Sequence, residues 1–135
     1  MSLNLQPIVS AEAQIGMEHY QTVIRSANHS IFADEPADHQ GTDTAMDPYS
    51  LLLASLGSCT AITLRMYADR KTWPVENILV KLALYKDTQG TVIERKIEFK
   101  GNLNADQLNR LLTIANSCPI SQILTGNIDI KTSLA

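Results

Sequence analysis

The chain has 135 residues, which is enough for one domain with a buried core, and we expect a single domain over residues 1–135. Its 11 basic and 14 acidic residues give a net charge of −3, and no basic run or face stands out. This balance argues against nucleic acid and against an anionic membrane surface as the main partner.

Residues 1–14 lack the basic region and the continuous apolar region of a secretory signal. The uncharged stretch from Pro48 to Leu64 is short for a membrane span and contains several Ser and Thr residues. We therefore expect a cytoplasmic protein with no membrane contact, in which the two cysteines are thiols rather than a structural disulfide. The three histidines have no metal-ligand spacing, so we expect no metal and no cofactor.

Three short strands are predicted at residues 9–16, 17–26 and 28–34, because each segment has few helix signals and is bounded by turn residues. Residues 34–48 follow as a long loop that contains two prolines, one glycine and several acids. Loops of this length inside a compact domain are often functional.

A long helix is predicted over residues 48–71, with Asp47 as its N-cap and Pro48 as its first residue. Spacings of three and four residues predict a buried stripe of Leu52, Leu56, Cys59, Thr63 and Met66. The other sides of the first four turns are also apolar or small, so we expect this helix to be surrounded by protein.

Residues 75–86 and 91–101 alternate between apolar and polar side chains and predict a hairpin. The apolar face of the second strand is interrupted by Arg95, which lies between Ile93 and Ile97. Arg95 is either an edge residue whose guanidinium reaches water, or a buried cation that pairs a carboxylate or stabilises a thiolate.

Asn104 and Gln107 form a capping-box pattern that predicts the start of another helix. Its expected buried stripe is Leu108, Leu111, Leu112 and Ala115. Cys118 is expected to cap a short helix that begins at Pro119 and stops at Gly126, and residues 127–134 predict a last strand. The order of elements indicates an α+β fold with antiparallel pairing.

The two cysteines, Cys59 and Cys118, carry the clearest chemical signal. Backbone N–H groups at a helix start favour a thiolate, which suits Cys118. A thiol that attacks and a thiol that resolves are the minimum needed to reduce a peroxide or exchange a disulfide. Each residue also has a structural interpretation, since Cys59 fits as a small buried hydrophobe and Cys118 as a turn residue.

Three segments resemble the OsmC/Ohr superfamily, and in particular its OsmC-like branch: DPYSLLLASLGSCTAITLRMYADRKTWPVE, ERKIEFKGNL and IANSCPISQIL. The resemblance runs from about Asp34 to the end of the chain. It implies an intertwined homodimer in which antiparallel sheets pack around a long buried central helix. It also implies that Cys59 attacks a peroxide to give a sulfenic acid, that Cys118 closes the disulfide, and that a dithiol reductant resets the pair.

The chain departs from the family pattern around the reactive thiol. The peroxidases of the family hold the thiolate with an arginine from the first strands and a glutamate just after the proline that opens the helix. Here Tyr49 and Ser50 follow Pro48, and the nearest N-terminal arginine is Arg25. We therefore take Arg95 and Arg25 as the candidates that stabilise the thiolate.

The favoured function is a thiol-dependent peroxidase for organic hydroperoxides, acting in oxidative stress defence. The expected substrate pocket is lined by Tyr49, Leu56, Ile62 and Met66. The alternative is a non-catalytic OsmC-like protein that binds a small apolar or thioester-like ligand at the dimer interface. A third hypothesis, a dithiol oxidoreductase for protein disulfides, has less support because no exposed CxxC motif is present.

Overall fold

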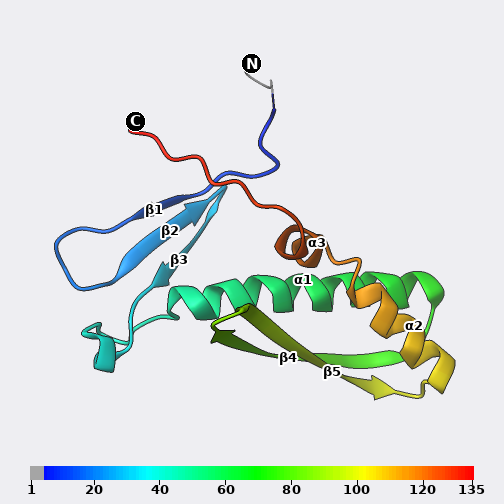
Figure 1. Cartoon of the computed structure of the whole chain (residues 1–135). Helices are drawn as coiled ribbons and strands as arrows, with labels where there is room; N and C mark the ends of the chain where they lie inside the picture. The colour runs from blue at the N-terminus through cyan, green and yellow to red at the C-terminus, as the bar shows by residue number, and fades with distance from the viewer. Residues whose placement is uncertain (1–4) are drawn as a thin grey trace. The chain divides into compact units, whose positions relative to one another are not determined.

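The structure is a computed structural model that describes residues 5–135. It contains three short strands, one turn of 3₁₀ helix, a long helix, a hairpin and two further helices (Figure 1). Their bounds are β1 Glu12–Gln14, β2 Thr22–Ser26, β3 His29–Ala33, η1 Ala37–His39, α1 Pro48–Lys71, β4 Val75–Asp87, β5 Gly90–Gly101, α2 Ala105–Ala115 and α3 Pro119–Thr125. Every strand pair is antiparallel, so the predicted α+β class is confirmed.

The chain forms two compact units, Met1–Leu51 and Leu52–Ala135. In the first unit, β1, β2 and β3 make a sheet in that order. Arg25 of β2 lies opposite Glu12 of β1 and Ser30 of β3. The three strands match the predicted segments but are shorter.

The loop after β3 is organised around the carboxylate of Asp34, which is only 2% exposed. Its oxygens accept hydrogen bonds from the backbone N–H groups of Tyr20, Glu35, Thr42 and Thr44, and from the hydroxyls of both threonines. These bonds, led by that from the Thr42 hydroxyl, hold the pKa of Asp34 well below its usual range. The predicted long loop is therefore ordered by one buried acid.

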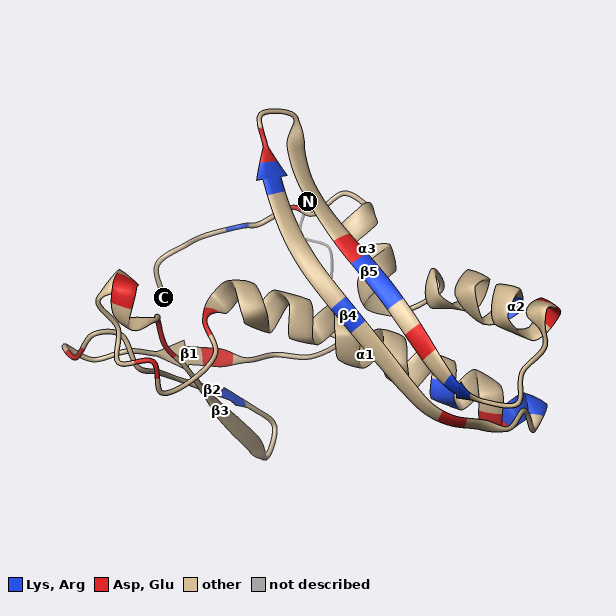
Figure 2. Cartoon of the chain, turned by 90° about the horizontal axis from the view of Figure 1, so that it is seen from below, with Lys and Arg blue, Asp and Glu red and all other residues tan. Residues whose placement is uncertain are grey.

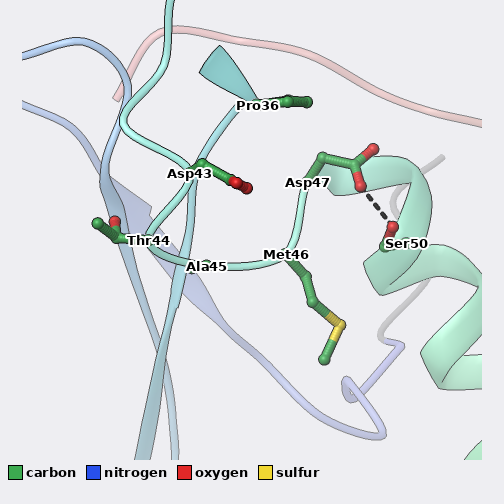
Figure 3. Close-up of a pocket in the computed structure, with 7 residues that line it drawn as sticks. All are labelled: Pro36, Asp43, Thr44, Ala45, Met46, Asp47 and Ser50. Carbon is green, nitrogen blue, oxygen red and sulfur yellow. Dashed lines mark hydrogen bonds between the residues drawn. The ribbon is translucent and has the colours of Figure 1, made fainter. Parts of the chain in front are cut away.

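Helix α1 begins at the residue that the sequence predicts. The Asp47 carboxylate accepts hydrogen bonds from the Ser50 hydroxyl, drawn as a dashed line in Figure 3, and from the Tyr49 N–H at 3.2 Å. The Asp47 carbonyl accepts the first helical bond, from Leu51 N–H at 3.0 Å. These contacts satisfy N–H groups that a helix start otherwise leaves unpaired.

The core of the second unit lies where α1, the hairpin and α2 meet (Figure 1). Its buried members are Leu64, Tyr67, Ala68, Val75, Leu111 and Ala115, and partly buried side chains pack around them. Gly57 lets α1 approach the hairpin closely, since a Cβ atom at this position would lie 2.9 Å from Cδ1 of Leu82.

The predicted buried stripe of α1 is partly wrong. The buried positions are Leu56, Thr60, Leu64, Tyr67 and Ala68, whereas Leu52 and Met66 are 39% and 67% exposed. Because almost every residue of the first four turns is apolar or small, polarity gives no contrast between faces, and the buried Thr60 is itself polar. The chain alone also does not surround α1, since Ile62 is 54% exposed.

Two further predictions need correction. In α2, Leu111 and Ala115 are buried as predicted, but Leu108 and Leu112 are exposed. The predicted strand at 127–134 is wrong, because the structure has no regular element after Thr125. Alternation alone does not make a strand, which needs a neighbour to pair its backbone groups.

Helix α1 is long and apolar enough to cross a membrane by length and composition, contrary to the expectation from its uncharged stretch. The core helix of a soluble protein passes the same test. Arg65 of this helix donates hydrogen bonds to the Val75 carbonyl at 2.8 Å and to Asp69 at 3.3 Å. We therefore interpret α1 as the core helix of its unit.

Candidate functional site

The two cysteines meet beside the start of α3. Cys59 lies on α1 and is half-buried, whereas Cys118 is fully buried and occupies the N-cap position of α3, directly before Pro119. Sγ of Cys118 lies 3.9 Å from the hydroxyl of Thr60, the residue that follows Cys59, and each thiol shifts the pKa of the other. The pair that the sequence singles out is therefore brought together by the fold.

The surroundings of the two sulfurs push their pKa values in opposite directions. Burial raises the pKa of the Cys59 thiol, and the neighbouring Cys118 thiol raises it further. Burial also acts to raise the pKa of Cys118, but the Cys59 thiol, the Ser121 N–H and the Thr60 hydroxyl together lower it below its usual value. When the pair loses one proton, the negative charge is therefore better held on Cys118.

Arg95 points to the core face of the hairpin, as the alternation predicts. It lies opposite Leu82 in the register of β4 and β5, and half-buried positions alternate with exposed ones along β5. Figure 2 shows the charged residues along this strand. Its Nη1 atom donates to the Thr60 hydroxyl at 2.9 Å and to the Ala115 carbonyl at 3.3 Å, and Nη2 donates to Oδ1 of Asn116 at 3.1 Å. The guanidinium is thus a partly buried cation, held by neutral oxygens.

The other predicted cation, Arg25, is exposed on β2 in the first unit. Tyr49 belongs to the same unit and is 59% exposed. The assignment of Arg25 to thiolate stabilisation and of Tyr49 to the pocket stays a prediction.

The predicted pocket residues of the second unit divide between two hollows. Leu56 lines a cavity of about 410 Å³ together with Arg95 and Asn116. The remaining lining residues of this cavity are Leu52, Thr91, Ile93, Ser121, Leu124 and Thr125. Ile62 and Met66 line a separate hollow of about 440 Å³ on another side of α1.

Sequence reasoning missed Thr60 and Asn116. Thr60 follows the apolar Leu56 by four residues and reads as a small spacer in an apolar helix, while Asn116 reads as the end of α2. Arg95 is the residue whose position could have pointed to both. A guanidinium on a core face needs hydrogen-bond acceptors from the elements that cover it, and Thr60 and Asn116 supply two of them.

Within residues 5–135, no group of three or more His, Cys, Asp or Glu side chains could hold a metal ion. The site as described consists of two thiols, one guanidinium and neutral hydrogen-bonding groups. Such an arrangement can perform thiol chemistry through a disulfide.

Comparison with known families identifies one match. The sequence profile of the OsmC-like protein family matches residues 41–133 of this chain. No curated protein matches the chain.

Several solved structures share the fold. An OsmC-like protein from Mycoplasma pneumoniae has 18% identity and a TM-score of 0.77, over 90% of each chain. An organic hydroperoxide resistance protein from Legionella pneumophila has 21% identity and a TM-score of 0.63, over 95% of this chain and 96% of the other. Another, from Elizabethkingia anophelis, has 18% identity and a TM-score of 0.66, over 94% of each chain.

Proposed function

The chain belongs to the OsmC-like protein family, part of the OsmC/Ohr superfamily, and from this membership we propose that it is a cytoplasmic thiol-dependent peroxidase for organic hydroperoxides. The observation that carries the proposal is that Cys118 lies against α1 at Thr60, the residue that follows Cys59. Two of the solved structures with this fold are organic hydroperoxide resistance proteins.

In the proposed reaction, Cys59 is the attacking thiol because it is the more accessible of the two. Its thiolate attacks the terminal oxygen of the hydroperoxide, so that an S–O bond forms, the O–O bond breaks and an alcohol leaves after taking a proton. Cys118 then attacks the Cys59 sulfenic acid, forming the disulfide and releasing water. An external dithiol reductant restores both thiols.

Burial raises the pKa of Cys59, so little of it is thiolate at neutral pH, and we expect its attack on the peroxide to become faster as the pH rises.

For the substrate, we propose that its organic group occupies the cavity beside Leu56 and Arg95. That cavity has apolar walls from Leu52, Ile93 and Leu124 and a polar side at Asn116. Tyr49, Ile62 and Met66 remain proposed lining residues of a wider pocket that a homodimer would complete.

The test is consumption of cumene hydroperoxide in the presence of dithiothreitol. We expect steady turnover by the wild type, none by Cys59→Ser, and slower turnover by Cys118→Ser, in which only dithiothreitol can reduce the sulfenic acid. With one equivalent of peroxide and no reductant, the wild type should lose both free thiols, while Cys118→Ser should leave a sulfenic acid on Cys59 that dimedone traps. A wild type that consumes no peroxide above the rate of Cys59→Ser contradicts the proposal.

The cavity also supports the second candidate, a non-catalytic protein that binds an apolar or thioester-like ligand. Its volume of about 410 Å³ lies within the range of small-molecule sites. This function would gain support from two results together. Neither the wild type nor Cys59→Ser would consume peroxide, and an acyl thioester would bind both proteins with equal affinity.

A further inference from the structure

The buried hydroxyl of Thr60 connects Arg95 to Cys118. Thr60 is fully buried on α1, and its oxygen accepts the hydrogen bond from Nη1 of Arg95 at 2.9 Å. The same oxygen lies 2.7 Å from the Leu56 carbonyl and 3.9 Å from Sγ of Cys118. A chain of polar contacts thus runs from the guanidinium to one of the two sulfurs.

This hydroxyl has one proton and two acceptors. While Cys118 is a neutral thiol, the Leu56 carbonyl is the better acceptor, and the 2.7 Å contact is the shorter of the two. A thiolate at Cys118 is a stronger acceptor, toward which the hydroxyl can rotate. Because Arg95 donates to the oxygen, it fixes the position of the hydroxyl and polarises it as a donor.

Arg95 is itself fixed to the segment that leads to Cys118. It donates to the Ala115 carbonyl and to the Asn116 side chain, which lie three and two residues before the cysteine. Within the part of the chain that the structure describes, neither a hydrogen bond nor an ion pair joins Arg95 to Cys59 or to any carboxylate. Arg95 therefore reaches Cys118 through the Thr60 hydroxyl and through the segment that precedes the cysteine.

We infer that Arg95 and Thr60 are positioning residues for the resolving half of the reaction, in which they hold the Cys118 sulfur as a thiolate that attacks Cys59. This inference rests on the proposed function. In the step itself, the Cys118 electron pair forms the S–S bond, the S–O bond of the Cys59 sulfenic acid breaks, and hydroxide leaves and takes a proton from solvent. The lowered pKa of Cys118 is in line with this assignment.

An exchange reaction with the aromatic disulfide DTNB tests the inference without any peroxide. Cys59 attacks the reagent, and the first equivalent of coloured thionitrobenzoate leaves. Cys118 then attacks the Cys59 sulfur of the mixed disulfide, and the second equivalent leaves. The second phase therefore reports the reactivity of Cys118 alone.

We expect Thr60→Val and Arg95→Met each to slow the second phase by about tenfold, the change that one pKa unit makes in thiolate fraction. The first phase should stay within about twofold of wild type, since neither side chain is hydrogen-bonded to the Cys59 thiol. The pH midpoint of the second phase should move upward in both variants, and Thr60→Ser, which restores the hydroxyl, should return both rate and midpoint to wild type. Lys96→Met is the matched control, because it removes a cation from the exposed face of the same strand.

Two outcomes overturn the inference: a second phase as fast as wild type in both variants, or a first phase slowed as much as the second. If Arg95→Met does not fold, the comparison of Thr60→Val with Thr60→Ser decides alone, since valine keeps the shape of threonine. If the wild type consumes no peroxide but the second phase depends on Thr60, the proposed function fails while the assignment to Cys118 stands.

Discussion

Nε of Arg110 on α2 donates a hydrogen bond of 3.0 Å to the hydroxyl of Tyr67 on α1. The Tyr67 side chain is buried, and the guanidinium of Arg110 also lies 5.7 Å from the centre of its ring. The contact ties α2 to α1. Because α2 leads directly to Asn116 and Cys118, it also sets where the thiol site begins.

Tyr67→Phe should lower the unfolding midpoint by a few degrees, since it removes this hydrogen bond but keeps the ring in the core. Tyr85→Phe is the control, because Tyr85 is 55% exposed and its hydroxyl has no hydrogen bond among the described residues. Thermal unfolding followed by circular dichroism measures both. Equal midpoints for the two variants would show that the contact adds nothing to stability.

Asp34→Asn should weaken the acid dependence of folding. The native pKa of Asp34 lies below its usual value of 3.8, so its stabilising effect is complete above that pH and is lost as the pH falls toward the native value. We expect the variant to be less stable at pH 7 and to lose less stability than wild type between about pH 4 and pH 2. Urea unfolding at several pH values measures this.

Asp43→Asn is the matched control for Asp34, because it removes one charge from the same loop and its exposed side chain accepts no hydrogen bond from described residues. It should resemble wild type at every pH. An Asp34→Asn variant whose stability falls with acid as steeply as that of wild type would contradict the prediction.

Gly101→Ala should destabilise the protein by about 2 kcal/mol or more. Gly101 has a φ of 142°, and a Cβ atom there would lie 2.1 Å from the Pro74 carbonyl oxygen. Gly90 has the same φ with no atom within 4 Å of the added carbon, so Gly90→Ala carries only the backbone strain, about 1 kcal/mol. Urea unfolding compares the two, and a smaller loss at Gly101 than at Gly90 would refute the steric argument.

The chain should form a dimer in solution. Ile62 and Met66 are 54% and 67% exposed on one side of α1, and apolar side chains on a core helix are best explained by a second copy that covers them. Light scattering at micromolar concentration should give twice the 14.9 kDa of one chain. The double variant Ile62→Glu, Met66→Glu should give a single-chain mass with its helix content intact, and a wild-type mass of one chain would contradict the expectation.

Local signals in the sequence predicted the elements well. Asp47 and Pro48 mark the start of α1, the capping box of Asn104 and Gln107 is present, and alternation placed Arg95 on the core face. These features depend on neighbours in the chain, which a sequence displays directly.

Tertiary partners were harder to predict. The buried Thr60 and the six-fold hydrogen-bonded Asp34 owe their importance to residues from other elements or from a folded loop, and the sequence around them resembles an ordinary helix and an ordinary loop. The prediction of a strand at 127–134 was wrong for the same reason. A strand forms only beside another strand, and the alternation of apolar and polar residues does not reveal whether one is present.

Because Cys118 is fully buried and Cys59 is not, an oxidant should damage the two cysteines to different extents. In the proposed reaction, an oxidant in excess reaches the half-buried Cys59 first, and the sulfenic acid is either captured by Cys118 or oxidised further to an irreversible sulfinic acid. Cys118 is shielded from both solvent and oxidant, so it survives as a thiol in the damaged molecules. The ratio of disulfide to Cys59 sulfinic acid in a sample therefore compares two rates. One is the rate at which Cys118 closes the disulfide, and the other is the rate at which the oxidant attacks the Cys59 sulfenic acid.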